Sequence, residues 1–182
     1  MRAAIAAATL VVALVVGALV LAQGNGDATV EAGVYLADIR AAPYTEWAFE
    51  PNVPAGYYVG IEPHGMILRT FVNDVALQDI EGDATTFSDG AIIVKENHMP
   101  GDFDISGMEP PAPVEGFAGN LAALTFMVKI EGFNPEAGDW FWAKTGAEEG
   151  TFDAVGAAEG CIACHADAAG DDYVFNTGPG GM

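Results

Sequence analysis

Residues 88–96 read Ser-Asp-Gly-Ala-Ile-Ile-Val-Lys-Glu, a turn signal followed by a β-branched apolar run that ends in two charged residues. Ser-Asp-Gly favours a turn, and Ile and Val favour strands because branched side chains pack well on a pleated surface. Similar runs lie upstream at residues 57–61 and 66–72 and downstream at residues 121–130 and 139–144. Turn residues separate neighbouring runs, so the sequence predicts a largely antiparallel sheet.

Shorter segments around these strands favour helix. Residues 34–42 suit a short helix that stops before Pro43, and residues 75–77 suit a helical turn beyond Asn73. Residues 99–119 contain four prolines and four glycines, which is long for a connection and leaves open a functional flap or a mobile insertion. We therefore predict an α+β fold with about five strands and helices at both ends.

The N-terminal residues have the pattern of an export signal. Arg2 precedes an uncharged stretch at residues 3–22 that ends in Val-Leu-Ala, as in a secretory signal peptide. A stretch of this length would also serve as an uncleaved membrane anchor. Residues 23–33 are rich in Gly, Asp and Ala and are predicted to form a flexible leader, and residues 34–182 to form one domain. Either form of the signal places that domain outside the cytoplasm.

The charge of the chain is strongly acidic. It carries 26 acidic and 6 basic side chains, for a formal net charge of −20. This balance excludes a nucleic-acid binder, which needs a basic surface. It suits either simple solubility or attraction to a basic redox partner such as a basic cytochrome.

The two cysteines of the chain lie in one short motif, Cys161-Ile-Ala-Cys164-His165. Residues three apart share a face of a helix, so both thiols can reach the vinyl groups on one edge of a porphyrin while His165 reaches the iron. A zinc half-site would need a second ligand pair, and a redox dithiol would follow an early strand. We predict a haem c attached through Cys161 and Cys164 and ligated by His165 on a C-terminal haem-binding helix. His64, before Gly65, is interpreted as a turn or hydrogen-bonded residue. Ligation of the iron by His64 or His98 is the less favoured alternative, because a second histidine ligand would fill the open coordination position.

Several stretches share their order and spacing with one known family. They are residues 68–72, 89–96, 138–140, 161–165 and 172–175. Together they resemble the cytochrome P-460 family, and the Gly-Ala-x-x-Val-Lys-Glu strand upstream of a C-terminal haem motif is the most discriminating part. The resemblance implies a periplasmic c-type mono-haem protein, predominantly of antiparallel sheet, commonly a homodimer and related to the β-sheet cytochromes c-prime.

The resemblance also implies roles for three further residues. Lys95 matches a lysine that is joined covalently to a meso carbon of the haem, although a strand-end lysine can equally point to water. Arg69 matches a family arginine that could pair with a haem propionate, or it could form a structural salt bridge. The family's catalytic carboxylate has Gly160 in its place here, so Glu159, one position earlier, is the candidate proton acceptor beside Lys95. A solvated acid is the alternative for Glu159.

Three functions follow from these expectations. The first is oxidation of hydroxylamine, to nitrous oxide or nitric oxide, at a five-coordinate haem iron with electrons leaving to a redox partner. The second is a non-enzymatic member of the same fold that binds nitric oxide in an apolar pocket. The third is a plain electron carrier, which would require a second strong axial ligand.

Overall fold

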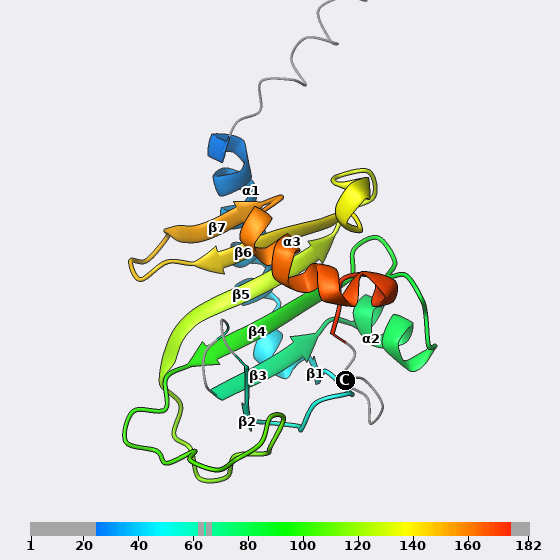
Figure 1. The fold of residues 1–182 in the computed structure, drawn as a ribbon. Coiled ribbons are helices and arrows are strands. Elements are labelled where there is room, and N and C mark those ends of the chain that lie inside the picture. Colours follow the sequence, from blue (N-terminus) through cyan, green and yellow to red (C-terminus); the bar gives the residue numbers. More distant parts are fainter. Residues whose placement is uncertain (1–24, 62–63, 65–66, 176–182) are drawn as a thin grey trace, which may run out of the picture.

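The computed structural model describes residues 25–61, 64 and 67–175, so the predicted signal peptide or anchor lies outside the described residues. A seven-stranded antiparallel sheet occupies the centre, in the order β1-β3-β4-β5-β6-β7 with β2 also paired to β3 (Figure 1). The α+β prediction, with a mainly antiparallel sheet and a C-terminal helix, is confirmed. The strands are β1 (Ala48–Phe49), β2 (Tyr58–Val59), β3 (Ile67–Val72), β4 (Ile92–His98), β5 (Leu121–Lys129), β6 (Trp140–Thr145) and β7 (Phe152–Gly156).

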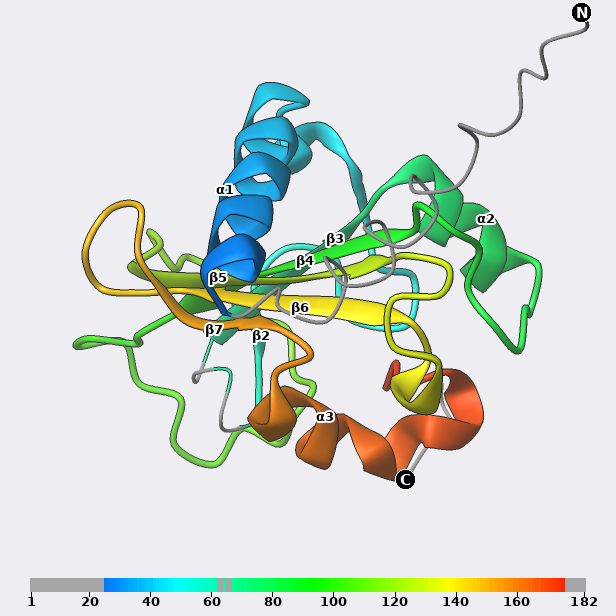
Figure 2. The ribbon, with the colours of Figure 1, turned by 90° about the horizontal axis from the view of Figure 1, so that it is seen from above.

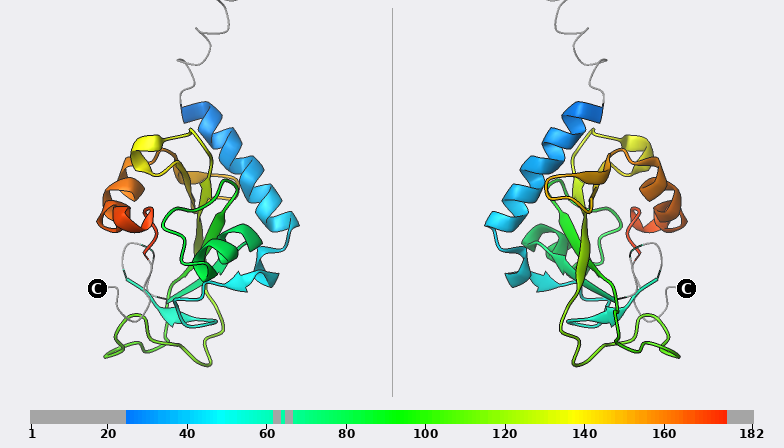
Figure 3. Two further views of the ribbon diagram at one scale, coloured as in Figure 1. Left: turned by 90° about the vertical axis from the view of Figure 1, so that its right-hand side faces the viewer. Right: turned by 90° about the vertical axis from the view of Figure 1, so that its left-hand side faces the viewer.

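Helices cover both faces of this sheet. They are α1 (Asn25–Ala41), α2 (Asp74–Glu81) and α3 (Glu159–His165), with short 3-10 helices η1 (Tyr44–Glu46), η2 (Pro135–Ala137) and η3 (Ala166–Asp171). Seen from above, α1 lies on one side of the sheet and α3 on the other (Figure 2), and the two side views agree (Figure 3). We call these sides the α1 face and the α3 face.

Each face has its own apolar core because side chains alternate along a strand. On the α1 face, Leu36 and Ile39 of α1 pack against Val94, Phe126 and Phe141. On the α3 face, the buried residues Ile93, Met127 and Trp142 pack against α3, and Ala76 of α2 and Phe87 extend this core. The sheet therefore separates two apolar cores that are built from different residues.

The register between β3 and β4 decides which polar side chains share a face. Arg69 pairs with Glu96, and Thr70 pairs with Lys95, which in turn pairs with Thr125 of β5. Paired residues of adjacent strands point to the same side of a sheet. Arg69 and Glu96 thus lie on the α1 face, and Thr70, Lys95 and Thr125 lie on the α3 face.

The prediction of a flexible leader at residues 23–33 is wrong for residues 25–33, which belong to α1. Ala32, Leu36 and Ile39 recur at helical spacing and are buried against the sheet. Tertiary packing of this stripe, together with contacts to β7, stabilises a helix that local propensity does not reveal. Among the residues that the structure describes, no helix is both long and apolar enough to cross a bilayer.

The long connection at residues 99–119 is folded onto β2 instead of projecting from the domain. Val59 N–H donates to the carbonyl of Ala112, and Val114 N–H donates to the carbonyl of Tyr57, both at 2.8 Å. Its apolar side chains, including Phe117, pack around the buried Val59 and Val114. This segment therefore completes the lower end of the domain and brings Pro110 and Pro111 to the α3 face.

Candidate haem site

The Cys161-Cys164-His165 motif forms most of α3, which crosses the α3 face of the sheet. His165 is buried, Cys161 is half-buried and Cys164 is exposed at the rim. All three line a cavity between α3 and the sheet. The helix therefore presents both thiols and the imidazole to the same space, as the spacing predicts.

The ring of His165 is held in one orientation. Its Nδ1–H donates to the carbonyl of Tyr173 at 2.7 Å, which leaves Nε2 as the nitrogen available to a metal. Trp142 and Phe175 contact the ring, with centroids 4.6 and 5.2 Å away. This is the arrangement expected of an iron-ligating histidine, with its second nitrogen fixed by the backbone.

The carbonyl of Tyr173 is itself positioned by a buried ion pair. Asp172, next to it, accepts from Lys129 Nζ at 2.5 Å and from Phe87 N–H at 2.8 Å. The chain passes so close to Gly138 that a Cβ there would lie 2.7 Å from Asp172 Oδ1, and Gly138 has a φ of 66°. Glycine is therefore required at this position, and the ion pair anchors the segment that orients His165.

Two adjoining cavities of about 410 and 170 Å³ make up the site. The larger has the size of an ordinary ligand pocket. Residues that line both cavities are His64, Ile93, Lys95, Met127, Cys164 and His165.

Two polar groups in the cavity wall lack partners within the part of the chain that the structure describes. Lys95 lines both cavities and forms no ion pair there, and the buried indole N–H of Trp142 has no hydrogen-bond acceptor. Burial lowers the pKa of Lys95, an effect that the charge of Glu50 partly offsets. Apolar walls, two thiols at the rim, a fixed imidazole and unpaired donors together fit a covalently attached haem.

Sequence reasoning missed Glu50, a buried carboxylate that lines the larger cavity together with Lys95. Asn52 N–H donates to its Oε1 at 2.9 Å. Burial raises the pKa of Glu50, although the bonds from Asn52 and the charge of Lys95 work in the opposite direction. In the sequence, this residue is one acid among 26, and only the pairing of β1 with β3 brings it to the cavity.

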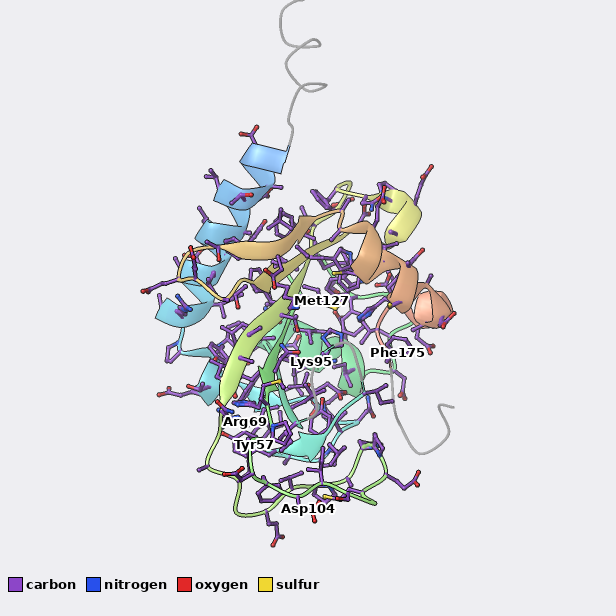
Figure 4. All side chains as sticks on the ribbon, turned by 60° about the vertical axis from the view of Figure 1, so that its left-hand side comes forward. Tyr57, Arg69, Lys95, Asp104, Met127 and Phe175 are labelled. Carbon is purple, nitrogen blue, oxygen red and sulfur yellow. The ribbon has the colours of Figure 1, made fainter. Side chains whose placement is uncertain are left out.

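Arg69 and Glu159 do not reach the cavity. Arg69 Nε donates to Glu96 at 2.6 Å on the α1 face, so the salt-bridge alternative is the one that the structure shows. Figure 4 shows Arg69 beside Tyr57 on that side, with Lys95 and Met127 toward α3 and Phe175. Glu159 is exposed and lies outside the lining of both cavities, because two residues of helix turn it about 200° away from Cys161. The propionate role of Arg69 and the proton-acceptor role of Glu159 are therefore not supported.

The two remaining histidines differ in environment. His98 is hydrogen-bonded through both nitrogens: Nε2 lies 3.0 Å from Glu96, and Nδ1 accepts from Asn120 N–H at 3.1 Å. His64, in contrast, faces the cavity. Burial, ahead of the charges of Lys95 and His165, lowers the pKa of His64 to about 3, so the ring is neutral at physiological pH.

Comparison with known proteins agrees with this geometry. The family model described as Cytochrome P460 matches residues 44–176, which span the chain from η1 to the segment after α3. No curated protein matches the chain. The match covers most of the chain and includes the sheet, the cavity walls and the Cys-x-x-Cys-His motif. The chain therefore belongs to the Cytochrome P460 family, a family of cytochromes with covalently bound c-type haem.

Proposed function

We propose that this protein is a periplasmic enzyme that oxidises hydroxylamine at a haem held by Cys161, Cys164, His165 and a covalent bond to Lys95. The observation that carries the proposal is the presence of an amine and a buried carboxylate in one mainly apolar cavity, since Lys95 and Glu50 both line it with His165. A pocket that only binds nitric oxide needs neither group. A proton-releasing oxidation uses the carboxylate, and the amine is the group that would join the haem.

Lys95 would hold the haem as a third covalent anchor. Its lowered pKa favours the neutral amine, which is the nucleophilic form. Such a bond would join Nζ to a meso carbon with the loss of one hydrogen from each, and an oxidant of the peroxide class would take up the two electrons. A nitrogen substituent on the macrocycle changes its electron density and planarity, which are two of the means by which a protein adjusts a haem.

Glu50 would accept the protons that the reaction releases. Two molecules of hydroxylamine give nitrous oxide, one water, four protons and four electrons, and a bound haem supplies the route by which the electrons leave to an external acceptor protein. A buried carboxylate with a raised pKa exchanges protons nearer neutral pH than an exposed one does. Asn52 N–H holds the acceptor oxygen in place.

The chain's partners follow from its charge. A net charge of −20 favours encounter with a basic electron acceptor, such as a basic cytochrome, and the association rate should fall as ionic strength rises. We further expect a homodimer, as the resemblance of the sequence implies. Retention of residues 1–22 would in addition anchor the protein to the membrane.

The first experiment uses the full chain matured with haem in a bacterial periplasm. Tryptic digestion and mass spectrometry should find the porphyrin joining the peptide that contains Lys95 to residues 145–182, two hydrogens lighter than the sum of the parts. A haem attached to the cysteines alone would contradict the proposed bond to Lys95. It would favour the second function, a cytochrome that binds nitric oxide without oxidising hydroxylamine.

The second experiment tests the proton acceptor with a matched pair of variants. Glu50→Gln should lower hydroxylamine-dependent reduction of an artificial acceptor by about a hundredfold or more. Glu159→Gln, the exposed control, should retain the wild-type rate. Loss of turnover in Glu159→Gln but not in Glu50→Gln would make Glu159 the proton acceptor in place of Glu50. If the wild-type protein itself does not oxidise hydroxylamine, the proposed enzymatic function is wrong.

A further inference from the structure

Two histidines face one another across the cavity. His64 lies between β2 and β3, and His165 lies at the end of α3, yet their ring centroids are 5.9 Å apart and their planes are at 88°. Both rings line both cavities. The fold thus brings a second imidazole to the side of the site opposite α3.

In both rings the nitrogen that the protein holds is Nδ1. His165 Nδ1–H donates to the Tyr173 carbonyl, and His64 Nδ1 lies 3.4 Å from the hydroxyl of Thr125. The same hydroxyl accepts from Asn97 Nδ2 at 3.2 Å and lies 3.5 Å from the carbonyl of Lys95. When His64 carries its proton on Nδ1, as His165 does, its Nε2 has the lone pair that a metal binds.

The separation of the rings matches a shared metal. A first-row metal binds imidazole nitrogen at about 2.0 Å, and a five-membered ring with bonds near 1.35 Å has its atoms about 1.1 Å from its centroid. Two imidazoles on opposite sides of one iron therefore have centroids about 6 Å apart. His98 offers no such geometry, because Glu96 and Asn120 occupy both of its nitrogens on the other face.

We propose that His64 is the sixth ligand of the haem iron, opposite His165, so that the resting protein is six-coordinate and a small nitrogen ligand must displace His64 to bind. The proposal rests on the haem site of the proposed function and adds a regulatory step to it. His165 lies in the helix that both cysteines would attach to the porphyrin, and His64 lies outside any regular strand or helix. His64 is therefore the ligand that leaves.

The test is spectroscopic and uses the full chain matured with haem. Ferric wild-type protein should give the optical and electron paramagnetic resonance spectra of low-spin, six-coordinate iron. His64→Ala should be high-spin and five-coordinate, and added imidazole should restore the low-spin spectrum. Phe175→Leu is the matched control, because Phe175 also packs on His165 but carries no ligand, and it should remain low-spin.

Ligand binding gives a second readout. Apparent affinity scales with the fraction of protein whose sixth position is open, so His64→Ala should bind nitric oxide about tenfold or more tightly than the wild type. A high-spin wild-type spectrum, or a low-spin spectrum that persists in His64→Ala without imidazole, would overturn the proposal. Equal nitric oxide affinities would do the same.

The outcome is separable from that of the proposed function. A high-spin wild-type protein that oxidises hydroxylamine would contradict iron ligation by His64 and support the proposed enzymatic function. If the wild-type protein is low-spin, His64→Ala is high-spin and neither oxidises hydroxylamine, then His64 is the iron ligand and the proposed enzymatic function is wrong.

Discussion

The two faces of the central sheet differ in whether their charged side chains have hydrogen-bond and ion-pair partners. Lys95 and Glu96 are neighbours on β4 and point to opposite faces. On the α1 face, Glu96 accepts hydrogen bonds from Arg69, Tyr44 and His98. On the α3 face, Lys95 has no ion-pair partner among the described residues and shares a cavity with Glu50.

The difference indicates where the fold serves stability and where it serves function. Buried polar groups in proteins are normally paired, and an unpaired one needs an explanation. The α1 face meets that requirement with its own side chains. Among the described residues, the α3 face leaves an amine without an ion-pair partner and an indole N–H without an acceptor, and two imidazoles line the same cavity. This is the signature of a site completed by a bound group.

The largest expected effect comes from breaking the network on the α1 face. Burial alone would raise the pKa of Glu96, but the hydrogen bonds from Arg69, His98 and Tyr44 outweigh it and lower that pKa. Glu96→Gln removes the charge that these donors share, and we expect the free energy of unfolding to fall by about 3 kcal/mol. Guanidinium unfolding of the haem-loaded protein, followed by circular dichroism, measures it. A loss below about 1 kcal/mol would mean that the network is not structural.

A somewhat smaller effect is expected at the ion pair that anchors the segment after α3. Asp172→Asn leaves Lys129 buried without a counter-charge and should lower the free energy of unfolding by about 2 kcal/mol. Asp153→Asn is the matched control, since its partner Lys144 is exposed and 3.5 Å away, and it should change stability by less than about 0.5 kcal/mol. Equal effects in the same unfolding assay would contradict the special role of the buried pair.

The smallest effect on stability is expected for Glu50, on the α3 face. Its pKa is raised in the folded protein, so the native state binds the proton more tightly than the unfolded chain does. The wild-type protein therefore loses stability as pH rises from the unfolded pKa, about 4.3, through the folded pKa, and the loss persists above it.

Glu50→Gln lacks this titration. At pH 7 it should be as stable as the wild type or more stable by up to about 1 kcal/mol, and the difference should shrink toward acid pH. Unfolding at several pH values checks this, because the titrating groups that do not interact with Glu50 contribute equally in both proteins. Parallel stability curves would show that Glu50 is not desolvated.

Much of the scaffold could be predicted from local sequence. β3, β4 and β5 form where the sequence predicts strands from β-branched runs, because that pattern matches a pleated, half-buried surface. β7 was not predicted, since its five residues, Phe-Asp-Ala-Val-Gly, carry no strong alternation. The helix α1 was shortened in the prediction because its first turns depend on burial of Ala32 against the sheet and not on propensity.

The contents of the site were harder to predict. The spacing of Cys161, Cys164 and His165 fixes their common helix face locally, so their convergence followed from sequence alone. Glu159 and Arg69 were assigned to the site and lie outside it, Glu159 because of its angle on the helix and Arg69 because of the strand register. Glu50 and His64 line the site without having been assigned to it, since longer-range geometry places them there.

The sequence by itself determined the class of fold, the family and the thiols and imidazole of the haem motif, because strand preference and helical spacing are properties of a few consecutive residues. Only the tertiary structure decided which other side chains face that motif. Side chains alternate along a strand, but the pairing register between strands decides which face of the sheet each set occupies. That register directs Lys95 into the cavity and Arg69 away from it, and chain segments more than 100 positions apart in sequence bring Glu50 and His64 to His165.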